Sequence, residues 1–121
     1  MEFEAKFPAD GFALGLGASD NANFQYCNGI AISNLNVFRT WKATSSTTNE
    51  GTQSSISAQH NTYYPFKFEY ENGTLSIYAN NTLVITYTGL GTLFNDINKT
   101  FSFQSWANGT VYIKNVKIKP L

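Results

Sequence analysis

Residues 66–87, FKFEYENGTLSIYANNTLVITY, decide the fold of this chain. The stretch holds three runs in which apolar and polar residues alternate, and the turns Asn72-Gly73 and Asn80-Asn81 separate them. Asn-Gly between two alternating runs is a strong signal for a β-hairpin, because both central residues of a type I′ turn need a positive φ. The stretch therefore predicts three antiparallel strands at 66–71, 74–79 and 82–87.

The same pattern resumes further along the chain. Residues 100–106, TFSFQSW, are followed by the turn Asn108-Gly109 and by residues 110–119, TVYIKNVKIK. A second Asn-Gly turn between alternating runs predicts a second hairpin with a fixed register. These closing strands need a second layer to pack against, which the upstream part of the chain must supply.

The last strand carries a break in its alternation. Val111 and Ile113 occupy odd positions, whereas Val116 and Ile118 occupy even ones. One extra residue in a strand shifts every later side chain to the other face. A β-bulge near Asn115 would therefore bring all four apolar side chains onto one face.

Upstream of residue 66 the strand signals are shorter. Alternating or apolar runs predict strands at 2–7, 12–17, 24–27, 29–33 and 36–43, with a brief one at 54–58. Residues 44–55 are almost wholly Thr, Ser, Asn, Gly and Gln and predict a surface loop, and residues 59–65 predict a bridge. About eleven short strands without a helix indicate an all-β sandwich or barrel of two packed antiparallel sheets.

Length and composition narrow the class of protein. The 121 residues indicate a single domain over 1–121, either a mature domain or one excised from a larger protein. Eight Lys and Arg balance eight Asp and Glu without a basic cluster, so we expect no nucleic-acid partner. One cysteine excludes a disulfide framework, and no apolar run reaches the roughly 20 residues of a membrane helix, so we expect no membrane insertion.

Three segments resemble a known superfamily. FKFEYENGTLSIYANNTLV, FSFQSWANG and VYIKNVKIKPL are similar to the closing hairpins of the concanavalin A-like lectin/glucanase jelly roll, particularly its laminin-G-like and keto-disaccharide-hydrolase-like branches. The resemblance covers residues 63–121 and is only architectural upstream. It implies two curved sheets of five to seven strands, with carbohydrate on or at the rim of the concave sheet. It also implies an accessory binding module as a common role.

No pattern of catalytic residues is present, so we expect no enzyme. The glucanase branch carries a Glu-x-Asp-x-x-Glu run, and this chain has none. Glu69 and Glu71 share their predicted strand face with Lys67, which indicates a solvated face, and Glu2 and Glu4 have the same interpretation. The single histidine, His60, stands among polar residues without a nucleophile partner and is predicted to lie in a loop.

One segment has the character of a calcium loop. Asp20-Asn21-Ala22-Asn23 resembles the oxygen-rich start of such a loop, and calcium occurs in the superfamily that the chain resembles. Only one acid is present, so affinity would be low. We therefore predict no metal ligands and no cofactor, with calcium as the one ion to consider.

Aromatic residues give the most informative candidates for a binding site. Sugar rings stack on Trp and Tyr while amide and guanidinium groups bond their hydroxyls. Residues of these types on the strand faces opposite the phenylalanine core, or at a rim, are predicted to bind glycan: Trp106, Gln104, Trp41, Arg39, Tyr26 and Tyr64. The alternative is that both tryptophans complete the core.

The sequence therefore favours a non-catalytic, lectin-like module that attaches a larger or oligomeric assembly to a polysaccharide. An extracellular, cell-surface or virion location follows, as in a phage tail or baseplate or a surface adhesin. The alternative is a structural or oligomerisation β-sandwich whose aromatic residues are buried at subunit contacts. A glycosidase would need two carboxylates about 5 to 10 Å apart in a cleft.

Overall fold

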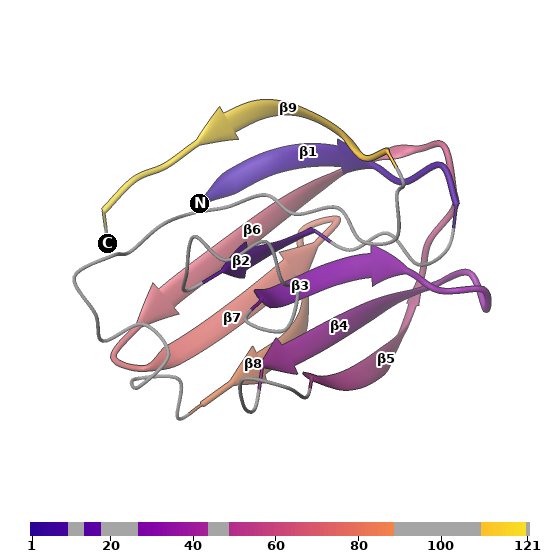
Figure 1. The fold of residues 1–121 in the computed structure, drawn as a ribbon. Helices are drawn as coiled ribbons and strands as arrows, with labels where there is room; N and C mark the ends of the chain where they lie inside the picture. Colours follow the sequence, from indigo (N-terminus) through magenta and orange to yellow (C-terminus); the bar gives the residue numbers. More distant parts are fainter. Residues whose placement is uncertain (10–13, 18–26, 44–48, 89–109, 121) are drawn as a thin grey trace.

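The computed structural model describes residues 1–9, 14–17, 27–43, 49–88 and 110–120. These residues form nine strands and no helix: β1 (Glu2–Lys6), β2 (Leu14–Gly17), β3 (Cys27–Ile32), β4 (Val37–Ala43), β5 (Asn49–Ser57), β6 (Tyr63–Glu71), β7 (Thr74–Ala79), β8 (Thr82–Tyr87) and β9 (Tyr112–Lys117). Sheet A has the strand order β8-β7-β6-β1-β9, and sheet B has the order β2-β3-β4-β5 (Figure 1).

All the strand pairs are antiparallel, which confirms the prediction of an all-β fold built from two antiparallel sheets. Of the eleven predicted strands, the one at 100–106 lies outside the described residues, and of the one at 24–27 only Cys27 is described, as the first residue of β3. Figure 1 shows β1 between β6 and β9, so that segments far apart in the sequence lie side by side in sheet A.

The two tight turns of sheet A have the predicted geometry. The φ angles are 49° at Asn72 and 77° at Gly73, and 50° at Asn80 and 63° at Asn81. Six described residues other than glycine have a positive φ, and all six are asparagine: Asn36, Asn61, Asn72, Asn80, Asn81 and Asn115. Asparagine tolerates the left-handed region better than most residues do. Part of the abundance of asparagine in this chain therefore serves backbone geometry.

The predicted bulge at Asn115 is confirmed. Glu4 pairs with Lys114 and Glu2 pairs with Lys117, so β9 has one residue more than β1 between these two pairs. Asn115 has a φ of 55° and takes up the extra residue. The bulge keeps Lys114 and Lys117 on one face of sheet A although they are three residues apart.

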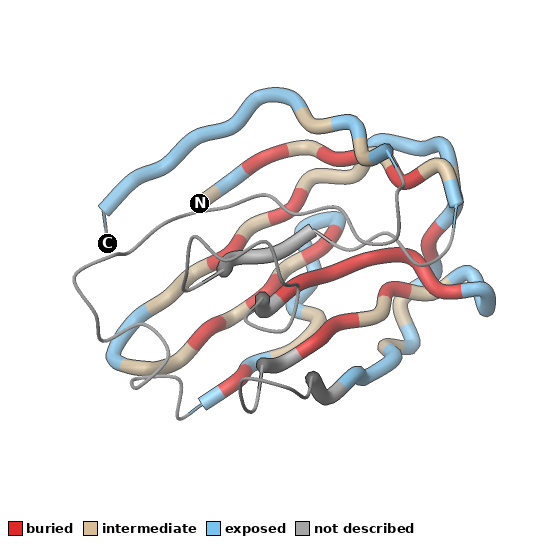
Figure 2. Tube along the Cα trace, in the orientation of Figure 1, coloured by how far each residue is buried: buried red, intermediate tan, exposed pale blue. Residues whose placement is uncertain are grey.

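Sheets A and B share one hydrophobic core. The Phe38 ring of β4 packs edge to face on Tyr64 and Phe66 of β6, with centroids 5.3 and 5.7 Å apart. The Tyr87 hydroxyl of β8 donates a 2.9 Å hydrogen bond to Thr40 Oγ1 of β4. Figure 2 shows buried positions on β1, β6 and β7 alternating with less buried ones, as the period of a strand requires.

Strand β5 corrects one prediction. Residues 49–55, expected in a surface loop, belong to β5 and pair with β4 in the register Thr40↔Thr52 and Trp41↔Gly51. Thr52 and Gln53 are exposed, so this strand has no alternation of apolar residues by which to recognise it. Its pairing depends on backbone hydrogen bonds at the edge of the described sheet, where polar side chains are favoured.

Strand β6 begins earlier than expected and includes a proline. Tyr63 starts the strand, and Pro65 pairs with Glu4 of β1. The carbonyl of Pro65 accepts a 2.8 Å hydrogen bond from Asn80 N, just past the end of β7. Because the N and O of one strand residue point to the same side, the missing N–H of Pro65 faces the end of β7 and costs no ladder bond.

Candidate ligand-binding face

The outer face of sheet A, opposite the core, carries a row of three side chains that spans three strands. Lys6 of β1 pairs with Tyr63 of β6 on one side and with Tyr112 of β9 on the other. Its Nζ lies 5.2 Å from the centre of the Tyr63 ring and 4.5 Å from that of Tyr112. The two tyrosines are 37% and 47% exposed, so this tyrosine–lysine row offers aromatic surface to solvent.

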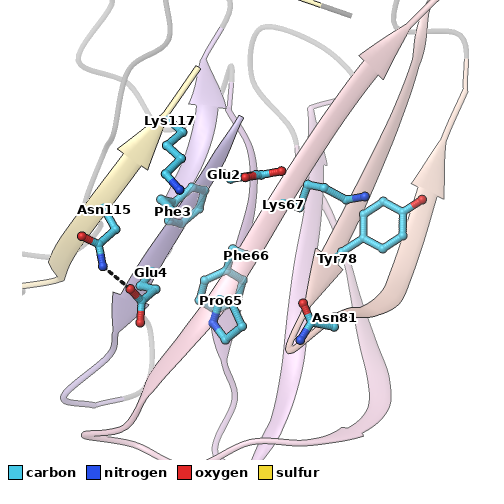
Figure 3. Close-up of a pocket in the computed structure, with 10 residues that line it drawn as sticks. All are labelled: Glu2, Phe3, Glu4, Pro65, Phe66, Lys67, Tyr78, Asn81, Asn115 and Lys117. Carbon is cyan, nitrogen blue, oxygen red and sulfur yellow. Dashed lines mark hydrogen bonds between the residues drawn. The ribbon is translucent and has the colours of Figure 1, made fainter. Parts of the chain in front are cut away.

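A hollow of about 860 Å³ lies next to this row on the same face. The residues that line it combine carboxylates, ammonium groups, amides and one phenol: Glu2, Phe3, Glu4, Pro65, Phe66, Lys67, Tyr78, Asn81, Asn115 and Lys117. Figure 3 shows Pro65 between Glu4 on one side and Asn81 on the other. The compact proline ring leaves this part of the face without a long side chain, so the sheet is hollowed there.

Both glutamates of β1 that line the hollow are flanked by cationic or amide groups. Glu4 accepts a hydrogen bond from Asn115 Nδ2, drawn as a dashed line in Figure 3, and its Oε1 lies 3.8 Å from Lys114 Nζ. Glu2 pairs in register with Lys67 and with Lys117. The glutamates predicted to lie on a solvated face therefore belong to a mixed polar surface.

Lys67 and Glu69 form an ion pair on β6, with 2.8 Å between Lys67 Nζ and Glu69 Oε1. The hydrogen bond from Lys67 lowers the pKa of Glu69 below its usual value, and the same bond raises the pKa of Lys67. Lys67 also lies over the Tyr78 ring, with its Nζ 4.2 Å from the ring centre. The pair thus connects β6 to β7 across the outer face.

Replacing Lys67 with methionine is expected to return the pKa of Glu69 toward its ordinary value of 4.5. A carboxyl group with a lowered pKa stabilises the fold above its unfolded pKa, and this contribution disappears as pH falls through the folded pKa. An NMR titration of the Glu69 side-chain carboxyl carbon below neutral pH measures the change. Lys114→Met is the matched control and should leave Glu69 unaffected; equal midpoints in wild type and Lys67→Met would contradict the assignment.

Trp41 and Arg39 lie on the outer face of sheet B, but the tryptophan is not exposed as predicted. Trp41 is only 6% exposed. Its cross-strand neighbours are Gly29 and Gly51, whose lack of side chains leaves room beside the indole. The Arg39 Cζ lies 5.1 Å from the centre of the Trp41 ring, and a Cβ on Gly51 would lie 2.9 Å from Arg39 Nη2. The Trp41 ring is therefore buried although it lies on the outer face of sheet B.

Tyr64 also faces inward and not toward a rim. Its ring packs on Phe38, and its hydroxyl accepts a 2.9 Å hydrogen bond from Gln59 N. The other predicted glycan-binding residues, Tyr26, Gln104 and Trp106, lie outside the described residues. The calcium-like segment at residues 20–23 lies outside them as well.

Among the described residues, no group of three or more His, Cys, Asp and Glu side chains is placed to hold a metal ion. The same residues contain no helix long and apolar enough to cross a membrane. His60 lies between β5 and β6, in the kind of connection that the sequence predicted for it.

The tyrosine–lysine row was missed at the sequence level. Alternation places Lys6 opposite Phe3 and Phe7 on its strand and therefore on the outer face, but it does not reveal the neighbouring strands. Pairing of β1 with both β6 and β9 is what brings Tyr63 and Tyr112 to either side of Lys6. This long-range pairing leaves no local signal in the sequence.

No protein-family model, curated protein or solved structure matches this chain. The outer face of sheet A combines exposed tyrosine rings, ammonium groups and amides beside a hollow. These groups suit a polar ligand that also presents flat apolar C–H faces.

Proposed function

We propose that the chain is a non-catalytic carbohydrate-binding module whose ligand lies on the outer face of sheet A. The observation that carries this proposal is the pair of exposed tyrosines, Tyr63 and Tyr112, beside a hollow lined by amides and charged groups. Sugars offer C–H faces to aromatic rings and hydroxyls to polar side chains. Asn81 and Asn115 supply amide groups at the hollow, within the same sheet.

The state of the carboxylates supports a binding role over a hydrolytic one. A glycosidase needs a carboxylic acid with a raised pKa to protonate the leaving group. The pKa of Glu69 is lowered by Lys67, and Glu4 is engaged by Asn115 and Lys114. The lowered pKa favours the ionised form of Glu69 and so disfavours this residue as the general acid that hydrolysis needs.

The wider proposal follows the resemblance of the C-terminal segments to the concanavalin A-like jelly roll. Two antiparallel sheets with a common core are compatible with that topology. A single open site on a sheet face binds weakly, near the millimolar level or about −4 kcal/mol. Several copies in a larger assembly, on a cell surface or a virion, would convert such binding into adhesion.

The test is binding of the wild-type chain and of Tyr63→Ala and Tyr112→Ala variants to an array of neutral and acidic glycans. Each variant should lose roughly tenfold in affinity, equivalent to about 1.4 kcal/mol. Leu83→Ala is the control, because Leu83 is 49% exposed on β8, away from the tyrosine–lysine row. No glycan bound by the wild type, or an equal loss in the Leu83 variant, would overturn the proposal.

A second candidate function is a structural or oligomerisation domain. Val116 is 44% exposed and Ile118 is 55% exposed, at β9 and just beyond it. β9 is the edge strand of sheet A in the described part of the chain, and exposed apolar residues at an edge favour association. Assembly that depends on protein concentration and is lost in Val116→Lys, without any glycan binding, would favour this function.

A further inference from the structure

We infer that the ligand of this face is an acidic polysaccharide, carrying carboxylate or sulfate groups, that lies along β9 and the tyrosine–lysine row. The inference rests on the proposed function and narrows it to one class of glycan. It begins from the charges of the outer face of sheet A. An acidic sugar needs cations that the carboxylates of the protein do not neutralise, whereas a neutral sugar does not. The groups around Lys6 and around the lysines on β9 therefore indicate which of the two classes of sugar this face suits.

Lys6 differs from Glu2 and Glu4, the other outward residues of β1, in its cross-strand neighbours. Glu2 and Glu4 have lysines as cross-strand neighbours, whereas the neighbours of Lys6 are Tyr63 and Tyr112. Among the described residues no carboxylate forms an ion pair with Lys6. Ring faces attract an ammonium group but do not neutralise its charge. Lys6 therefore presents a positive charge between two exposed rings.

The tyrosine rings themselves favour an anionic sugar. Lys114 Nζ lies 4.1 Å from the centre of the Tyr63 ring, and Lys6 Nζ lies 5.2 Å from it. A neutral sugar that stacks on Tyr63 would compete with these ammonium groups for the ring. A sugar that carries a carboxylate or sulfate could pair with the ammonium groups while its ring lies against the tyrosine.

The two lysines of β9, and Lys119 just beyond it, extend this positive surface. Lys114 and Lys117 share the outer face because of the bulge at Asn115, and Lys119 lines a small hollow beside Lys117 and Glu2. From Tyr112 to Lys119 the chain can span up to about 23 Å at about 3.3 Å per residue. This length suits several successive sugars of a polymer. All three lysines are exposed and can adjust to the spacing of the anionic groups.

Three acidic side chains lie beside these cations, Glu2, Glu4 and Glu69, and none of them removes the excess. Glu69 lines the small hollow with Lys117 and Lys119 but is paired with Lys67 at 2.8 Å. Glu4 already accepts from Asn115 and lies 3.8 Å from Lys114, while Glu2 lies in register between Lys67 and Lys117. Lys6, Lys114, Lys117 and Lys119 therefore exceed the two glutamates of β1 by two positive charges. The chain as a whole has a formal net charge of zero, so this excess is local to the strip.

The experiment compares binding of the full chain to polygalacturonate, dextran sulfate and unmodified dextran by calorimetry or biolayer interferometry. We expect one polyanion to bind at least about tenfold more tightly than dextran, and the tighter one identifies carboxylate or sulfate as the recognised group. Binding should weaken as NaCl rises from about 0.1 M to about 1 M, where the screening length falls from about 10 Å to about 3 Å.

Two variants of Lys6 separate its charge from its packing. Lys6→Met keeps an unbranched side chain between the rings and should lose roughly fivefold in affinity for the polyanion, whereas Lys6→Arg should stay within about twofold. Glycan binding that depends on Tyr63 but is unchanged in Lys6→Met would overturn this inference and leave the proposed function standing. Polyanion binding that is unchanged in both Tyr63→Ala and Lys6→Met would also overturn it, because the attraction would then be nonspecific. No binding to any glycan would overturn the proposed function itself.

Discussion

Replacing Phe38 with alanine is expected to lower the free energy of unfolding by about 3–5 kcal/mol, the range for removing a buried phenylalanine ring. The Phe38 side chain is fully buried, at 0% exposure. It is also the β4 residue whose ring packs edge to face on Tyr64 and Phe66 of β6. The cavity left by alanine would remove these contacts between the two sheets. Urea denaturation followed by circular dichroism measures the loss.

Leu83→Ala provides the comparison for this measurement. Leu83 belongs to β8 of sheet A but is 49% exposed, so its truncation should change the free energy of unfolding by about 0.5 kcal/mol or less. A loss below about 1 kcal/mol for Phe38→Ala would contradict a core shared by the two sheets.

Trp41→Ala is expected to destabilise the fold by a similar amount, about 3–5 kcal/mol. The reason is burial, since only 6% of Trp41 is exposed. Under conditions in which the variant remains folded, its affinity for glycan should equal that of the wild type. Thermal unfolding and glycan binding, measured on the same preparation, test both parts of this expectation.

Tyr63→Ala should show the opposite pattern. Tyr63 is 37% exposed, so the variant should keep most of its stability and lose ligand affinity. If Trp41→Ala were instead as stable as the wild type and unable to bind glycan, the binding site would belong on the outer face of sheet B, beside Arg39. The two variants together therefore decide between the two faces.

Much of the fold could be predicted because its strongest signals are local. The alternation of residues 66–87 and the Asn-Gly turn at 72–73 gave both ends of β7 and β8 and the last residue of β6. The change of parity around Asn115 also predicted the bulge, because an extra residue must move later apolar side chains to the other face. In these segments the residues of each strand are enough to predict where the strand ends or bulges.

The parts that were missed depend on contacts between distant strands. Residues 49–55 have no apolar alternation, and only their pairing with β4 makes them a strand. A proline such as Pro65 is normally a sign that a position is not inside a strand. It is tolerated in β6 because β7 ends opposite Phe66, the next residue. The early start of β6 could not be recognised without knowing where its neighbour stops.

The candidate site was less predictable than the fold, for a related reason. Alternation correctly separated Arg39 and Trp41 from Phe38 on β4, but it could not show that Trp41 would be buried on the outer face. The interpretation that exposed aromatics mark a binding surface led to two tryptophans and to Tyr26 and Tyr64, because both residue types stack on sugar rings. The exposed rings of the described surface belong to Tyr63 and Tyr112, which come together only when β1 enters between their strands.

The central position of β1 in sheet A also has a consequence for how the chain folds during synthesis. The strand lies between β6 and β9, and 111 residues separate Glu4 from Asn115, its partner across the sheet. The ribosome must translate the chain through β9 before β1 can gain its second neighbour. Such a high contact order predicts slow folding, and the nascent chain exposes unpaired strand edges in the meantime. Chaperone binding to the nascent chain would therefore be most useful until β9 has emerged.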